Sequence, residues 1–288
     1  MMDFAETKSS RSSLRDTNSP QYKAVEWLAQ DKIDNGSNWS GYELLQRYVL
    51  RILFHSTGGD SWAGPNFDAS TTWFGASSVC NWGSIDAECN GNGQVDRIDL
   101  SQNNLQGAIP DELWQLTAMA YLDLRLNQEL TGTIPTQIGQ LTALTWLSLS
   151  GIQLSGTIAT QFGLLSDLRY LYLSHNELTG TIPTQLGQLT GLRALYMHEN
   201  QLTGSIPATL PQSTDLDFIF LYNNFLTGQV PSAFCAAPFP DWRADGPNLP
   251  GKTFWTDCIS EVQCDCCDRC YDESGKCFRW NGSGFSSC

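Results

Sequence analysis

The feature that most constrains this chain is a sequence repeat of about 24 residues. Its six copies begin at Val95, Met119, Leu144, Leu168, Leu192 and Leu216. One inserted residue near Gln128 and Glu129 accounts for the single longer spacing. Apolar residues alternate with other residues at the start of each copy, which is the pattern of a strand with one buried face. One copy cannot bury its own apolar side, so we expect the copies to stack as the coils of a solenoid.

The columns of the repeat have distinct physical roles. An asparagine near the end of each strand can bond backbone groups that the following turn leaves unpaired. This column holds Asn103, Asn127, Asn176, Asn200 and Asn224. In the third copy Ile152 stands in the asparagine column and Ala159 in the proline column. Since Ile152 cannot make these bonds, we expect a gap in the ladder there.

The consensus L-x-x-L-x-L-x-x-N-x-L-x-G-x-I-P resembles the plant-type leucine-rich repeat over residues 95–234. The resemblance implies an α/β solenoid, a right-handed superhelix with a concave parallel sheet, a helical N-terminal cap and a disulfide-rich C-terminal cap. The chain is similar in this respect to the ectodomains of receptor-like proteins and kinases. It is also similar to secreted inhibitors of cell-wall-degrading enzymes.

The segments around the repeats complete a four-part organisation. Residues 1–18 are serine-rich and polar, and we expect them to be disordered. Residues 19–94 are expected to form the helical cap, with one helix starting at Ser19-Pro20 and a second over residues 42–55. The resemblance to plant-type caps implies a disulfide between Cys80 and Cys89, although the second cysteine stands further away than the pattern expects. The repeats occupy 95–234, and a Cys-rich cap is expected over 235–288.

The last segment is dense in cysteine. It holds Cys235, Cys258, Cys264, Cys266, Cys267, Cys270, Cys277 and Cys288. We expect these residues to form disulfides, whose connectivity the sequence does not define. A metal cluster over 264–270 is the alternative, but the spacing is tighter than that of ordinary zinc sites and no histidine accompanies it. We therefore predict no metal and no cofactor. The tail resembles those of some algal repeat proteins.

The cysteines and the net charge limit where the protein can be located and which partners it can have. Ten cysteines gathered at the two ends favour an extracellular or cell-surface protein, in which Asn35, Asn38 and Asn281 would be glycan acceptors. No signal peptide and no membrane-spanning segment are visible, which conflicts with the cysteines and suggests a truncated N-terminus. A net charge of −14 argues against nucleic-acid partners and anionic lipid surfaces.

Aromatic side chains gather at the outward positions of the predicted strands. The predicted ligand-binding residues are Tyr121, Trp146, Tyr170, Tyr172, Tyr196, His198, Phe218, Phe220 and Tyr222. Coils one to three place charged residues beside them instead, including Asp99 and Arg125. Exposed aromatic clusters of this size usually mark a binding surface, although strands favour aromatic residues in any case.

These observations predict a recognition protein that binds a protein, peptide or glycan through the concave aromatic face, with a membrane co-receptor as a possible partner. Inhibition of a cell-wall-degrading hydrolase is the alternative. A third hypothesis is ice binding by the Thr/Ser-Gly-Thr/Ser segments, whose hydroxyl groups would stack in register. The sequence contains no phosphate loop, nucleophile elbow or H-E-x-x-H motif, and we predict no enzyme activity. His175 and His198 fit polar contacts on a binding face better than an acid–base pair.

Overall fold

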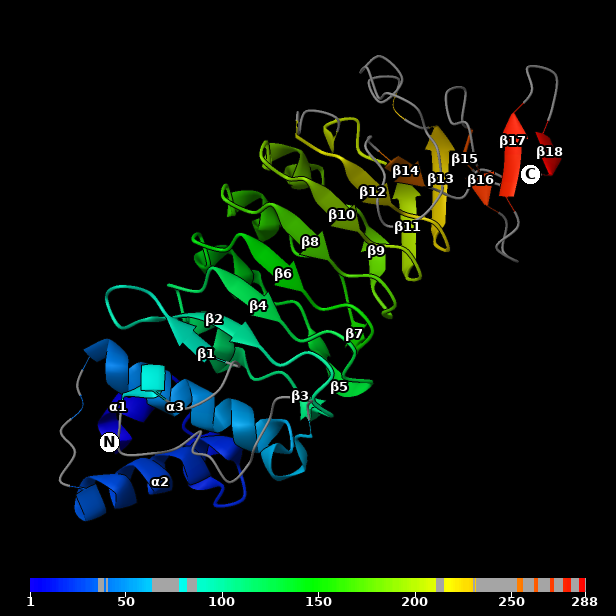
Figure 1. Ribbon diagram of the computed structural model, residues 1–288. Helices are drawn as coiled ribbons and strands as arrows, with labels where there is room; N and C mark the ends of the chain where they lie inside the picture. Colours follow the sequence, from blue (N-terminus) through cyan, green and yellow to red (C-terminus); the bar gives the residue numbers. More distant parts are fainter. Residues whose placement is uncertain are drawn as a thin grey trace. The chain divides into compact units, whose positions relative to one another are not determined.

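The computed structural model describes residues 1–35, 39, 41–63, 78–81, 87–210, 215–229 and 231, together with the backbone of five short strands between residues 253 and 287. It divides into two units, Met1–Gly132 and Thr133–Cys288. Unit 1 contains the helices α1 to α3, the first repeat and the first half of the second, and unit 2 contains the rest of the second repeat and the other four (Figure 1).

Unit 1 begins with helices. They are α1 (Met2–Glu6), η1 (Ser13–Arg15), α2 (Pro20–Asn35), α3 (Gly41–Ser56), η2 (Gly59–Ser61) and η3 (Val79–Asn81). The start of α2 is the predicted one, because the Ser19 hydroxyl accepts a hydrogen bond from the Tyr22 amide at 3.0 Å and Pro20 occupies the first helical position. A turn with Gly58 in the left-handed region, at φ 67°, follows α3.

The expectation of disorder over residues 1–18 is wrong. Ala5 and Leu14 are buried against the cluster that α2 and α3 build around Tyr48. The Ser9 hydroxyl bonds the Tyr48 hydroxyl at 2.8 Å and also donates to the carboxylate of Glu112. The segment is poor in apolar residues, but the few it has are well placed and tied down by polar side chains.

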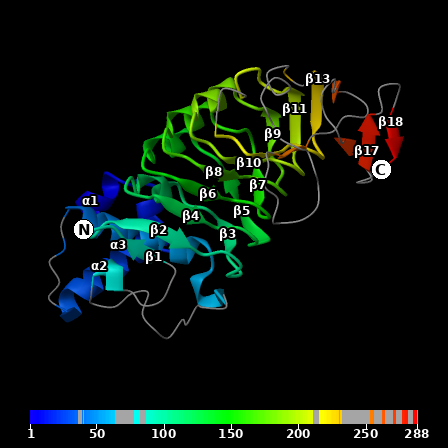
Figure 2. The same cartoon turned by 45° about the horizontal axis from the view of Figure 1, so that its top comes forward.

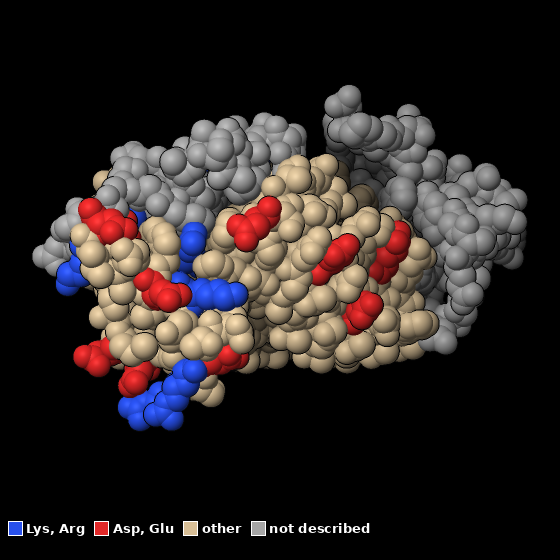
Figure 3. Space-filling model, turned by 90° about the horizontal axis from the view of Figure 1, so that it is seen from below, with Lys and Arg blue, Asp and Glu red and all other residues tan. Residues whose placement is uncertain are grey.

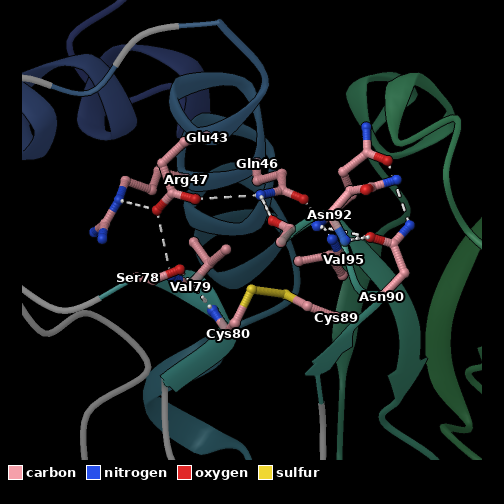
Figure 4. The surroundings of a disulfide bond; sticks show 12 residues. Glu43, Gln46, Arg47, Ser78, Val79, Cys80, Cys89, Asn90, Asn92 and Val95 are labelled. Carbon is pink, nitrogen blue, oxygen red and sulfur yellow. Dashed lines mark hydrogen bonds and ion pairs between the residues drawn. A yellow bond between two sulfur atoms is a disulfide. The ribbon is translucent and has the colours of Figure 1, made fainter.

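Helix α3 also holds the entry to the first repeat (Figure 4). Cys80 and Cys89 form the disulfide that the resemblance implied. The buried Gln46 side chain donates to the Gly93 carbonyl at 3.2 Å and accepts from the Val95 amide. Glu43 accepts from the Val79 amide at 3.3 Å. The helix thereby satisfies backbone groups that a preceding coil would otherwise bond.

The strands of unit 1 follow. They are β1 (Ala87–Cys89), β2 (Val95–Asp99), β3 (Gln106–Ala108), β4 (Tyr121–Asp123) and β5 (Glu129–Thr133), with η4 (Asp111–Gln115) between β3 and β4. Strand β1 is antiparallel to β2, whereas β2 is parallel to β4 and pairs Arg97 with Tyr121. Strands β3 and β5 are parallel as well.

Unit 2 repeats one coil of two strands and a 3₁₀ helix. The first row of strands is β6 (Trp146–Ser148), β8 (Tyr170–Tyr172), β10 (Ala194–Tyr196) and β12 (Phe218–Phe220), all parallel and in the register of the repeat. The second row is β7 (Gln153–Ser155), β9 (Thr179–Thr181), β11 (Gln201–Ser205) and β13 (Phe225–Gln229). The helices are η5 (Thr136–Gln140), η6 (Thr160–Leu164) and η7 (Thr184–Gln188). Figure 2 shows successive coils side by side. The predicted parallel strands are confirmed.

Short strands follow the last repeat. They are β14 (Thr253–Trp255), β15 (Val262–Gln263), β16 (Cys270–Tyr271), β17 (Cys277–Trp280) and β18 (Phe285–Ser287). Strands β14 and β15 pair with β12 and β13, and β16 to β18 form an antiparallel sheet of their own. The side chains of the tail cysteines and of Asn35, and the whole of Asn38 and Asn281, lie outside what the structure describes.

The asparagine column makes the predicted ladder. In unit 2 the Asn200 amide nitrogen donates to the carbonyls of Leu173 and Met197 at 2.9 and 3.1 Å, and its oxygen accepts from the Leu178 amide at 3.0 Å. Ile152 is buried in the same column and cannot replace these bonds. The Leu130 amide, which is the equivalent of Leu178, donates instead to the carbonyl of Asn127 within its own turn at 2.9 Å.

Candidate ligand-binding site

The strand face of unit 2 carries a continuous set of ring contacts, which we call the aromatic cluster. It comprises Trp146, Tyr170, Tyr172, Tyr196, His198, Phe220 and Tyr222. Its members come from β6, β8, β10 and β12, and from the residues just after β10 and β12. Because the strands are in register every 24 residues, rings at equivalent positions of successive coils become neighbours.

The rings touch both edge-on and face-on. Trp146 contacts Tyr170 and Tyr172, with centroids 4.9 and 5.0 Å apart. Tyr172 meets Tyr196 edge-on at 4.8 Å, and Tyr196 stacks on Phe220 at 4.4 Å with the planes 29° apart. Stacked rings cover each other's faces, so Tyr196 and Phe220 use a face on one another and leave edges and the Tyr196 hydroxyl for other contacts.

His198 is buried, contrary to the expectation that it points outward. The residue is 7% exposed, and its imidazole stacks on Tyr222, with centroids 4.5 Å and planes 20° apart. The ring of His175 meets it edge-on at 5.0 Å. Burial, helped by the nearby His175, lowers the pKa of His198 to about 4, so the ring is neutral at pH 7. Burial likewise raises the pKa of Tyr196.

Two polar atoms beneath this face lack a partner among the described residues. They are Nδ1 of His198 and Oγ of Ser148, and both are buried. By contrast, the Ser174 hydroxyl donates to Ser150 Oγ at 3.0 Å. Buried polar atoms without a partner are uncommon in folded proteins and often mark functional positions.

Charge is sparse around the aromatic cluster. None of its members is Lys, Arg, Asp or Glu. At its edge His175 Nδ1 lies 2.7 Å from Glu199 Oε2, and both residues have left-handed backbones at equivalent positions of successive coils. On the face shown in Figure 3, acidic side chains lie scattered over uncharged surface rather than in one patch. An uncharged aromatic surface suits a ligand segment with apolar groups.

Two further predicted ligand residues lie outside the cluster. Phe218 lies on β12, half-buried, in register with Ala194. Tyr121 belongs to unit 1, where the guanidinium of Arg97 covers its ring at 3.5 Å. Arg97 is also 3.0 Å from Asp99, so the strand face of unit 1 is ionic in character. The role of Phe218 in binding stays a prediction, whereas the cover by Arg97 argues against the role predicted for Tyr121.

The threonine array has structural roles. The hydroxyls of Thr179 and Thr203 donate to the carbonyls of Gly156 and Gly180 at 3.1 and 3.3 Å. The second hydroxyl residue of each copy, at positions 133, 157, 181 and 205, is exposed. The strands pair with a stagger, since Thr203 lies opposite Thr181 rather than Thr179. The array is therefore skewed relative to the rectangular one that the sequence suggested.

The described part of the chain offers neither a metal site nor a membrane-spanning helix. There, no group of three His, Cys, Asp or Glu side chains is placed to hold a metal ion. Likewise, none of the described helices is long and apolar enough to cross a membrane.

Comparison with known proteins agrees with this architecture. A leucine-rich repeat family matches residues 142–202, and a second leucine-rich repeat family matches residues 94–116. No curated protein matches the chain. The chain therefore contains leucine-rich repeats and has the solenoid fold seen in plant receptor ectodomains.

Three solved structures illustrate the likeness. A plant ice-binding protein is 28% identical, with a TM-score of 0.61, over 79% of this chain and 66% of that one. The PEPR1–AtPEP1 structure is 29% identical, with a TM-score of 0.54, over 64% and 25%. The Arabidopsis receptor kinase HAESA ectodomain, solved with an IDA peptide hormone, is 25% identical, with a TM-score of 0.52, over 75% and 31%. The chain thus spans a quarter to two thirds of the length of these proteins.

Proposed function

We propose that this protein is an extracellular recognition protein whose aromatic cluster binds an extended peptide or protein segment. The observation that carries the proposal is the unbroken run of ring contacts from Trp146 to Tyr222, without a charged member. Aromatic side chains supply most of the energy in such interfaces. The peptide hormone bound by the HAESA ectodomain supports the same class of ligand. The disulfide between Cys80 and Cys89 supports an oxidising compartment.

Ring geometry favours a peptide over a glycan. Sugars pack on open aromatic faces, whereas Tyr196, Phe220, His198 and Tyr222 use faces on one another. The edges of aromatic rings carry partial positive charge and suit oxygen acceptors such as peptide carbonyls.

A peptide library displayed on phage tests the proposal. Selection on the wild-type protein, with counter-selection on the Tyr196→Ala variant, should enrich peptides that bind only the intact cluster. Calorimetry then measures their Kd. Recovery of peptides that bind both proteins equally, or of no peptide while a glycan array gives ligands, would contradict it. Hydrolase inhibition would use the same surface, and a selected hydrolase inhibited by the protein would support that alternative.

Ice binding is a second candidate because the plant ice-binding protein shares this fold over 79% of the chain and the outer threonine column is exposed. The hydroxyls of Thr179 and Thr203 are engaged with backbone carbonyls, which weakens the case. Thermal hysteresis of the wild-type protein is the direct measurement. If hysteresis is present, Thr157→Lys should reduce it by placing a charge in the array, and if hysteresis is absent the candidate is eliminated.

A further inference from the structure

His198 is the polar group around which the aromatic cluster closes. Tyr222 covers one side of the imidazole, and the rings of His175 and Phe220 approach it at 5.0 and 5.9 Å. Its Nδ1 is buried and has no hydrogen-bond partner in the described part of the chain. Nε2 also makes no hydrogen bond there, but unlike Nδ1 it is not fully buried, so it is the ring nitrogen that can reach a ligand.

The tautomer of this ring follows from its surroundings. A buried N–H without an acceptor is rarer in proteins than an acceptor left without a donor. Nδ1 should therefore carry the lone pair, and the proton should lie on Nε2. The low pKa of His198 keeps the ring in this neutral form at pH 7. At neutral pH the accessible nitrogen is then a hydrogen-bond donor only.

We propose that His198 is the specificity-determining residue of the aromatic cluster, and that its Nε2–H donates a hydrogen bond to an oxygen acceptor of the ligand. This inference rests on the proposed function of the cluster. The acceptor class is a peptide carbonyl or a carboxylate, flanked by apolar groups that meet Tyr196 and Phe220. A ligand that offers only a donor at this point leaves Nε2–H unpaired and is rejected.

The groups that face His198 are consistent with this role. His175 approaches from the preceding coil and is held by Glu199 at 2.7 Å. Tyr196 lies on the same coil at 6.1 Å, and the following coil contributes the rings of Phe220 and Tyr222. Protonation of Nδ1 would bury a charge with no acceptor beside it. Since both the neutral and the charged ring carry the Nε2 proton, binding should stay flat from pH 8 to about pH 6.

The test uses peptides recovered by selection on the wild-type protein and two matched variants. His198→Phe keeps the stack on Tyr222 but removes the donor, and should raise the Kd at least ten-fold. His175→Phe makes the same change on the neighbouring, exposed histidine and should alter the Kd less than two-fold. Peptides in which one backbone amide at a time is reduced to an amine that lacks the carbonyl oxygen locate the acceptor. Loss of the contacted carbonyl should weaken binding to the wild type and leave binding to His198→Phe unchanged.

The nitrogen-15 chemical shifts of the free wild-type protein give an independent readout. They should show a protonated Nε2 and an unprotonated Nδ1, with titration near pH 4. A proton on Nδ1 overturns the proposal, even if the His198→Phe variant does not fold. So does a folded His198→Phe variant that binds as tightly as the wild type while Tyr196→Ala does not, and that result would leave the proposed function standing. If Tyr196→Ala also binds unchanged, the proposed function itself fails.

Discussion

The methyl group of Thr181 occupies the space into which a side chain on Gly204 would project. A Cβ added to Gly204 would lie 2.9 Å from Thr181 Cγ2, and Gly204 has a φ of 75°. Thr181 and Gly204 lie on adjacent coils of unit 2, and the Thr181 methyl group fits only because Gly204 has no side chain. The Thr-Gly-Thr pattern therefore has a packing role that is independent of any ligand.

Gly204→Ala should destabilise unit 2 by about 2–3 kcal/mol, because it combines left-handed backbone strain with a clash. Gly156→Ala is the matched control. Its φ is 81°, but its Cβ would lie 3.5 Å from Thr133 Cγ2, an ordinary contact, so only the strain of about 1 kcal/mol applies. Adding Thr181→Ser to Gly204→Ala should recover the difference. Equal denaturation midpoints for the two alanine variants would contradict this account.

The buried His198 makes stability depend on pH. Its pKa is about 4 in the folded protein against an ordinary value of 6.5. The unfolded chain therefore binds more protons between these values, and stability falls as the pH drops from about 6.5 to 4. The full effect is about 3 kcal/mol. Burial lowers the pKa of His55 to about 4 as well, and it acts in the same direction.

Denaturant unfolding of the wild type and His198→Phe at pH 7.5 and pH 4 isolates this contribution. His55 and the carboxylates are common to both proteins and cancel in the comparison. On going from pH 7.5 to pH 4, the wild type should lose more free energy of unfolding than His198→Phe does. Parallel pH profiles would show that His198 titrates normally in the folded state.

The asparagine ladder gives a third prediction. Asn200→Asp keeps the size of the side chain but replaces the amide that donates to Leu173 and Met197 with a carboxylate facing their carbonyls. Loss of the two donors and the buried charge should cost about 3 kcal/mol or more. Asn92→Asp, at an exposed turn position, is the control and should change the free energy of unfolding by less than about 0.5 kcal/mol. The measurement is chemical denaturation at pH 7.

The sequence was enough to predict the coils because one period determines both the strands and their register. Once Tyr170 is placed on a strand, the period requires Trp146 and Ala194 to be its neighbours, as observed. That the first eighteen residues are folded rather than disordered could not be predicted in this way. It depends on contacts such as that between Ser9 and Glu112, which are 103 residues apart and have no periodic signature.

The aromatic columns were predictable, but not the state of each ring. Alternation along a strand shows that His198 points to the same side as Tyr196. Whether it is exposed depends on how Tyr222 and His175 turn their rings, which is decided by packing on both neighbouring coils. The same holds for Ser148, whose burial beneath the face has no signal in the repeat.

The aromatic cluster itself gives the last prediction. Tyr172 and Tyr196 lie at its centre, each in contact with rings on both adjacent coils. Replacing either by Ala should weaken binding of the selected peptides by about 2 kcal/mol, or about thirty-fold in Kd, because central aromatic residues dominate interface energy. Tyr121→Ala makes the same change where Arg97 covers the ring, and Asp99→Ala removes a charge of the ionic unit 1 face. Both should change the Kd less than three-fold. Circular dichroism should show the same fold in all four variants. If the Tyr121 and Asp99 variants lose binding while the Tyr172 and Tyr196 variants keep it, the ligand site lies on the strand face of unit 1.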